Sequence, residues 1–173
     1  MGTVFFAGVY GVGKSTIIEK LSASTGLLAF SAGDLISARN GEKYGANKAV
    51  SDKTSNQSIL IECVSELLLN NPRILLAGHF CIATKEGQVD RLPGFVFERI
   101  AIEKIILLEA PAKMIVSHLS LRDGKLYSVG FIEEILREER LAAEKAANHL
   151  HTPLTVYEMT FSEKDEMALL QEL

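Results

Sequence analysis

The stretch Gly8-Val9-Tyr10-Gly11-Val12-Gly13-Lys14-Ser15-Thr16 near the start of the chain decides its fold. It matches G-x-x-x-x-G-K-S, the pattern of a phosphate-binding P-loop. The apolar run 3–7 before it is typical of a buried strand, and apolar residues at helical spacing follow Ser15. A strand, a glycine turn and a helix N-terminus together aim backbone N–H groups at phosphate oxygens. We therefore predict a triphosphate site here.

Each residue of this loop has an expected part in that site. Lys14 is expected to reach the β- and γ-phosphates and to stabilise the transferring group, and the Ser15 hydroxyl is expected to ligate Mg²⁺. The alternative is a glycine turn that only happens to match the pattern. The predicted nucleotide contacts are Gly8, Gly11, Val12, Gly13, Lys14, Ser15 and Thr16.

Length and composition limit the classes of protein to consider. The 173 residues suit one core, so we predict a single domain over residues 1–173. A net charge of −4 argues against nucleic-acid binding, which needs a basic face. No apolar run approaches the roughly 18 residues of a membrane helix, and the apolar start has no basic leader. We expect a cytoplasmic protein that acts on a small molecule, with no protein partner indicated.

Strand and helix signals alternate along the chain, which favours a parallel sheet with helices on both faces. We predict an α/β three-layer sandwich with a five-stranded parallel sheet. The expected strands are 3–7, 27–30, 73–77, 104–108 and 153–158. The expected helices are 15–21, 35–38, 54–69, 95–100, one opened by Pro111, 131–150 and one begun by Ser162.

The segments between these elements are expected to be irregular or polar. Residues 40–53 are expected to form a loop, 81–93 to be irregular, and 121–131 to form a short lid. Asp165 is expected to cap the last helix with Ser162. The core side of the helix after Pro111 is expected to be Met114, Ile115 and Leu119. The residues expected to form a solvated face of helix 131–150 are Glu133, Glu134, Glu138, Glu139 and Glu144.

Four further segments resemble the adenylate-kinase-like small P-loop kinases, which include archaeal-type adenylate kinases and related bacterial ATP-binding proteins. Ser31-Ala32-Gly33-Asp34-Leu35 resembles the segment that borders the acceptor nucleotide, and Gly78-His79-Phe80 resembles the end of the third strand. Residues 84–94 resemble the loop that follows, and Leu121-Arg122-Asp123 resembles the lid. The resemblance implies a nucleoside-monophosphate-kinase fold that uses ATP and Mg²⁺, with AMP as the first candidate acceptor.

The chain departs from that family at three positions. Ala77 stands where the family has an aspartate that orients the Mg²⁺ shell, and Ser120 replaces the first lid arginine. Arg39 lies two residues beyond the position at which the family has the arginine that meets the acceptor phosphate. These departures keep two alternatives open, which are a nucleotide-binding regulatory module and a weak ATPase whose acceptor is water.

Arg122 is the second catalytic candidate, because phosphoryl transfer needs mobile cations that neutralise the equatorial oxygens. Its alternative is a solvated charge at a helix end. Residues 40–70 are expected to form the acceptor-binding segment. The candidate acceptor contacts are Asp34, Gln57, His79, Arg91 and Arg140.

Every acceptor candidate also has a plain structural interpretation. Asp34 can instead cap a helix, Gln57 can be solvated, and His79 can be a buried imidazole bonded to the backbone. Arg91 can instead pair with its neighbour Asp90, and Arg140 can pair with Glu144 one turn later. The sequence leaves these alternatives open.

Overall fold

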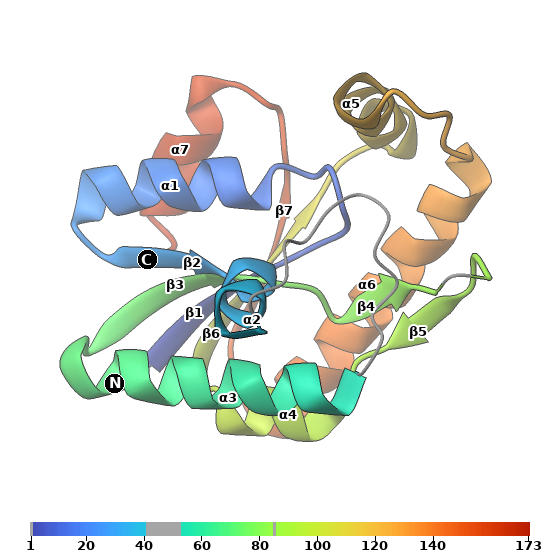
Figure 1. Cartoon of the computed structure of the whole chain (residues 1–173). Coiled ribbons are helices and arrows are strands. Elements are labelled where there is room, and N and C mark those ends of the chain that lie inside the picture. The colour runs from blue at the N-terminus through green and yellow to red at the C-terminus, as the bar shows by residue number, and fades with distance from the viewer. Residues whose placement is uncertain (1, 41–52, 85) are drawn as a thin grey trace.

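The computed structural model describes residues 2–40, 53–84 and 86–173. A five-stranded parallel sheet of order β2-β3-β1-β6-β7 runs through its centre (Figure 1). The strands are β1 Gly2–Ala7, β2 Leu28–Ser31, β3 Arg73–Ala77, β6 Ile102–Glu109 and β7 Leu154–Glu158. The predicted fold class is confirmed. The P-loop follows the central strand β1, so it lies in the middle of the carboxyl edge of the sheet.

Helices cover both faces of this sheet (Figure 1). The helix bounds are α1 Lys14–Thr25, α2 Ala32–Asn40, α3 Lys53–Asn70, α4 Gly94–Arg99, α5 Ala112–Asp123, α6 Val129–Leu150 and α7 Glu163–Leu170. Helices α1 and α7 cover one face, and α3, α4 and α6 cover the other. The central strands β1, β3 and β6 are therefore buried on both sides, which explains their continuous apolar runs.

Three local expectations need correction. Residues 81–93 are not irregular, because β4 Cys81–Ala83 and β5 Val89–Arg91 pair as an antiparallel hairpin. The hairpin turn is closed by the Thr84 N–H, which donates to the Gln88 carbonyl at 2.8 Å. Helix α5 continues to Asp123 and α6 begins at Val129, so only residues 124–128 link them. Met114 is 39% exposed rather than in the core, whereas Ile115 and Leu119 are buried.

A fourth correction concerns the acidic face of α6. Glu133, Glu134 and Glu144 are exposed as expected, but Glu139 is only 1% exposed. It follows Ile135 by one helical turn and precedes Ala143 by one, and both of these are fully buried. The side chain of Glu139 therefore faces the interior.

The remaining segments need little comment. The predicted cap of the last helix is confirmed, because Ser162 and Asp165 form a reciprocal capping box on α7. The expected loop 40–53 lies almost entirely outside the described residues. In the ranges that the structure describes, no helix combines the length and apolar character needed to cross a bilayer.

Candidate functional site

The loop between β1 and α1 has the backbone geometry of an anion cradle. Gly8 has a φ of 145° and Gly11 has a φ of 77°, values that side-chain-bearing residues rarely adopt. A Cβ on Gly8 would lie 2.6 Å from the Leu108 carbonyl oxygen, and one on Gly11 would lie 2.8 Å from Cγ of Leu119. No side chain caps the first N–H groups of α1, whose N-cap is Gly13. These N–H groups therefore remain available to donate hydrogen bonds to a phosphate.

The Lys14 side chain folds back onto this loop. Its ammonium donates hydrogen bonds to the carbonyl oxygens of Gly8 at 2.7 Å and Val9 at 2.9 Å. The residue is 9% exposed, and this burial lowers the pKa of Lys14 to about 7, although the charge of Glu139 opposes the shift. Phosphate oxygens can replace both carbonyls, so the ammonium lies at the right end of the loop to bind them.

The buried carboxylate of Glu139 joins the P-loop to the end of β3. It accepts the N–H of Gly8 at 3.1 Å, that of Phe80 at 2.9 Å and that of Cys81 at 2.7 Å. Burial raises the pKa of Glu139, while these donors and Lys14 favour its ionised form. Sequence reasoning missed this residue. The signal was available, because Glu139 falls in helical register with Ile135 and Ala143.

A cleft of about 1200 Å³ opens in front of the P-loop and is lined by Lys14, Ser15 and Thr16. Strand order divides it into two halves, since β6 and β7 lie on one side of β1 and β3 and β2 lie on the other. The first half, here called the nucleotide half, is lined by His118, Leu119, Arg122, Met159 and Phe161. The second, the acceptor half, is lined by Phe5, Gly33, Ile36, Gln57, Leu60, His79, Ile82, Thr84, Leu92, Val96 and Phe97.

The last turn of α5 places Arg122 among the residues that line the nucleotide half. Its guanidinium donates two hydrogen bonds to the neighbouring Asp123, at 2.6 and 2.9 Å, and its side chain is 60% exposed. Asp123 also accepts a hydrogen bond from the Tyr127 hydroxyl. Arg122 and Tyr127 together lower the pKa of Asp123 to about 2. Arg122 is therefore a charged, solvent-facing group that lines the cleft, as a lid arginine must be.

Two of the predicted acceptor residues line the cleft. Gln57 of α3 is 5% exposed, and its Oε1 has no hydrogen-bond partner. His79 follows β3 and packs against the Tyr10 ring, with the ring centroids 4.3 Å apart. Its Nδ1 is shielded from solvent and also has no partner. Burial and the Lys14 charge lower the pKa of His79 well below its ordinary value, although a hydrogen bond between the imidazole and the Gly8 backbone opposes the shift, so the imidazole is neutral.

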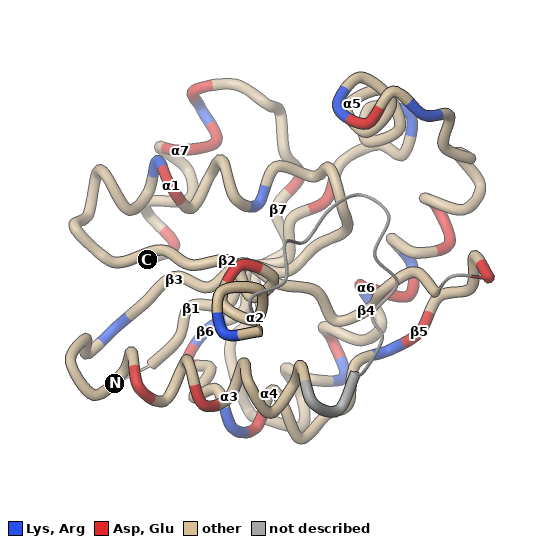
Figure 2. Tube along the Cα trace, viewed as in Figure 1, with Lys and Arg blue, Asp and Glu red and all other residues tan. Residues whose placement is uncertain are grey.

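The other three predicted acceptor residues are not among those that line the cleft. Asp34 is exposed in the first turn of α2, where its charge favours the helix. Arg91 pairs with Glu138 at 2.6 Å rather than with Asp90, and Arg140 pairs with Glu109 rather than with Glu144. Acidic and basic residues are interspersed along the described chain (Figure 2), so both arginines find carboxylates on neighbouring elements.

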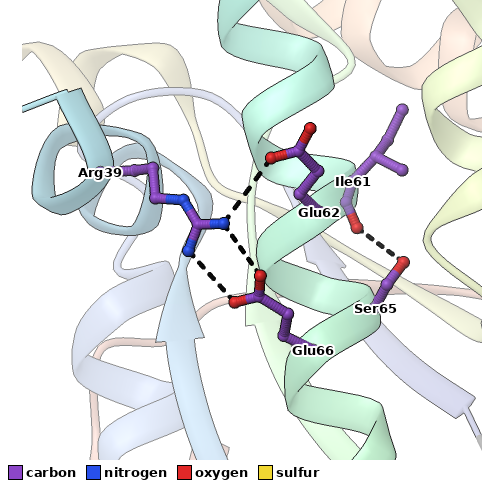
Figure 3. Close-up of polar contacts among 5 residues, drawn as sticks. All are labelled: Arg39, Ile61, Glu62, Ser65 and Glu66. Atoms are coloured by element: carbon purple, nitrogen blue, oxygen red, sulfur yellow. Dashed lines mark hydrogen bonds and ion pairs between the residues drawn. The ribbon is translucent and has the colours of Figure 1, made fainter.

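Arg39 is also not among the residues that line the cleft. Its guanidinium donates to both carboxylate oxygens of Glu66 on α3, at 2.9 and 3.1 Å, and lies 3.7 Å from Glu62 (Figure 3). All three side chains are well exposed. This arginine therefore ties the end of α2 to the outer side of α3.

The residues fit a Mg²⁺ ion that arrives with the nucleotide. Ser15 is exposed in the first turn of α1 and lines the cleft beside Lys14. The described part of the chain contains no group of three His, Cys, Asp or Glu side chains placed to hold a metal by itself. Ala77, at the end of β3, also lines the cleft but offers no oxygen. Phosphate oxygens, water and the Ser15 hydroxyl are the ligands that this site offers.

Residues 7–136 match a known protein family, described as an AAA domain. This match covers most of the chain, including the P-loop, β3, α5 and the first turns of α6. The chain belongs to the AAA domain family. No sequence match was found among curated proteins.

Solved structures with this fold include several small P-loop kinases. Shikimate kinase from Acinetobacter baumannii in complex with shikimate aligns with a TM-score of 0.60 and 14% identity, over 99% of this chain and 92% of that one. Shikimate kinase from Aquifex aeolicus gives 0.56 and 16%, over 98% and 92%. A gluconokinase from Sinorhizobium meliloti gives 0.54 and 11%, over 99% and 88%. The likeness shows the P-loop kinase fold over the whole chain and does not single out the adenylate kinases.

Proposed function

We propose that this protein is an ATP-dependent kinase that transfers the γ-phosphoryl group to a small acceptor molecule. The observation that carries the proposal is the continuity of the cleft. Its nucleotide half begins at the free N-terminus of α1 with Lys14, and its acceptor half ends at Gln57 and His79. A volume of about 1200 Å³ exceeds the roughly 300–1000 Å³ of an ordinary small-molecule pocket, so it has room for two molecules.

In this proposal the chain positions the reactants and neutralises charge. The acceptor oxygen forms a bond to the γ-phosphorus while the bond from that phosphorus to the β,γ-bridging oxygen breaks. ADP leaves with the electron pair, and the acceptor proton passes to water. Lys14 and Arg122 stabilise charge on the transferring group, and the free N–H groups of the P-loop hold the phosphates. Ser15 holds Mg²⁺, which neutralises phosphate charge when bound.

The resemblance of the sequence to adenylate kinases makes a nucleoside monophosphate, AMP first, one candidate acceptor. The structurally similar kinases act on shikimate or belong to the gluconokinases, so the fold is compatible with other alcohols. The test is an acceptor screen with ATP and Mg²⁺ that reads ADP formation for nucleosides, nucleoside monophosphates, sugars and cyclic alcohols. Acceptor-dependent ADP release supports the proposal, and ADP release at the same rate with every acceptor and with none contradicts it.

A second candidate function follows from Ala77. Since β3 ends without a carboxylate, the chain can instead be a nucleotide-binding regulatory module or a weak ATPase. Calorimetry distinguishes these functions from a kinase. Tight ATP binding without acceptor-dependent turnover favours the module, and ADP release that needs only water favours the ATPase. In either case, a gain of acceptor-dependent turnover in Ala77→Asp would identify the missing carboxylate as the cause.

A further inference from the structure

We infer that the acceptor half of the cleft binds a neutral, ring-bearing alcohol of the nucleoside type, whose hydrogen-bond donors meet Gln57 Oε1 and His79 Nδ1. The inference rests on the proposed function, because it names the class of acceptor for the same cleft. It departs from the expectation that the acceptor is a nucleoside monophosphate.

The first observation is the pair of unpartnered polar atoms. Gln57 Oε1 and His79 Nδ1 are the buried side-chain atoms without a hydrogen bond among the described residues, and both belong to residues that line the cleft. Leaving such an atom unpaired is unfavourable, so native proteins rarely do it without a reason. A ligand that donates to these atoms would remove the cost on binding.

The kind of partner follows from the chemistry of the two atoms. An amide oxygen only accepts hydrogen bonds, so Gln57 Oε1 requires a donor. The His79 imidazole is neutral, and its Nδ1 accepts a hydrogen bond whenever the proton is on Nε2. A hydroxyl or an N–H group satisfies both atoms. A phosphate or carboxylate oxygen, which carries no proton, satisfies neither an amide oxygen nor an accepting nitrogen.

The walls around these atoms are apolar. Phe5, Ile36, Leu60, Leu92, Val96 and Phe97 contribute to the acceptor half. The Phe5 and Phe97 rings lie edge to face with their centroids 5.7 Å apart. Such walls suit the face of a flat ring better than a polyol, whose hydroxyls would lose their hydration there.

The positions of the basic residues give the last argument for a neutral acceptor. Of the described residues assigned above to the acceptor half, none is a lysine or arginine. Lys14 and Arg122 line the P-loop and the nucleotide half, and the exposed Lys20 of α1 also lines the cleft. Arg39, Arg91 and Arg140 belong to exposed ion pairs and are not among the residues that line the cleft; Figure 3 shows the pair of Arg39. Burying an anion without a cation is costly, so the described walls favour a neutral acceptor.

The experiment compares each nucleoside with its own 5′-monophosphate, a pair that differs by one phosphate group. Calorimetry with Mg²⁺ and a non-hydrolysable ATP analogue measures binding, and ADP release with ATP measures transfer. We expect each nucleoside that binds to do so at least about tenfold more tightly than its monophosphate. Tighter binding of the monophosphates, or no binding of any nucleoside, overturns the inference. Nucleoside binding without transfer sustains it and contradicts the kinase proposal.

Variants of Gln57 test the contact itself. Gln57→Leu and Gln57→Met remove the unpaired oxygen, so the melting temperature of the free protein should stay the same or rise. Nucleoside binding should weaken about tenfold, which is the loss of one good hydrogen bond, while ATP binding is unchanged. The exposed Gln171 on the far end of α7 provides the control, and Gln171→Leu should change neither quantity. Unchanged nucleoside binding in a folded Gln57 variant would overturn the inference.

Discussion

The two halves of the cleft are built in opposite ways. The P-loop side of the nucleotide half comes from one contiguous stretch, and its ligand donors are backbone N–H groups and the charged Lys14. The acceptor half is gathered from β1, α2, α3, the β4–β5 hairpin and α4, and its polar atoms belong to neutral side chains. In the proposed function, triphosphate recognition would therefore follow from local sequence, whereas acceptor recognition would depend on packing between distant segments. Variants can test this contrast.

The largest effect is expected at Lys14, on the nucleotide half. Lys14→Ala removes the cation that we propose stabilises the transferring phosphoryl group, so turnover should fall by at least about 10³-fold. The fold should persist, because the hydrogen bonds of the ammonium among the described residues go to two carbonyls of its own loop. Steady-state ADP release and the melting temperature check the two parts. Lys145→Ala, on the exposed side of α6 and outside the cleft lining, is the matched control. Wild-type turnover in folded Lys14→Ala would contradict the kinase proposal.

Substitution of Glu139 tests whether the P-loop side of the nucleotide half depends on residues outside the contiguous stretch that contains Lys14. Glu139→Ala leaves the buried N–H groups of Gly8, Phe80 and Cys81 without their acceptor. The free energy of unfolding should fall by about 2–4 kcal/mol, because several buried donors lose their partner together. Urea denaturation measures this change. The exposed Glu134 on the same helix is the control. If Glu139→Ala lowers the free energy of unfolding as little as Glu134→Ala does, the Glu139 carboxylate does not stabilise the fold.

These two residues also show how far sequence reasoning reaches. Lys14 was predictable because the P-loop pattern fixes both its position and its neighbours. Glu139 was not predicted, because a glutamate among five on one helix suggests solvent unless its register with Ile135 is weighed. The sheet followed from apolar runs, but the short β4–β5 hairpin did not, since three-residue strands give little alternation.

The acceptor half was harder to predict for a physical reason. Gln57 and His79 were identified as candidates, and the structure brings both to the cleft. Arg91 and Arg140 were candidates because a nearby cation suits an acceptor phosphate, but each pairs with a carboxylate from another element. Such partners lie 47 and 31 residues away along the chain, so sequence spacing does not show them.

The pH dependence of ATP binding gives a smaller and graded effect. Burial holds the pKa of free Lys14 at about 7, and the negative phosphates should raise it towards its ordinary value. Between these two values, ATP binding takes up a proton, so the Kd should increase by up to about tenfold for each unit that the pH rises above 7. Calorimetry in buffers of different ionisation enthalpy measures the proton uptake. Lys14→Arg, which does not titrate in this range, should lose it; the same uptake in that variant would assign the proton to another group.

The smallest effect is expected at Arg91 and Arg140, outside the acceptor half. Both belong to solvent-exposed ion pairs, whose contribution to stability is at most about 1 kcal/mol. Since neither side chain lines the cleft, Arg91→Ala and Arg140→Ala should change the KM for the acceptor by less than about twofold. Steady-state kinetics with the best acceptor from the screen measure the change. A tenfold rise in KM in either variant would mean that this arginine reaches the acceptor during turnover. The acceptor half would then bind its ligand through a charged side chain, as the nucleotide half does.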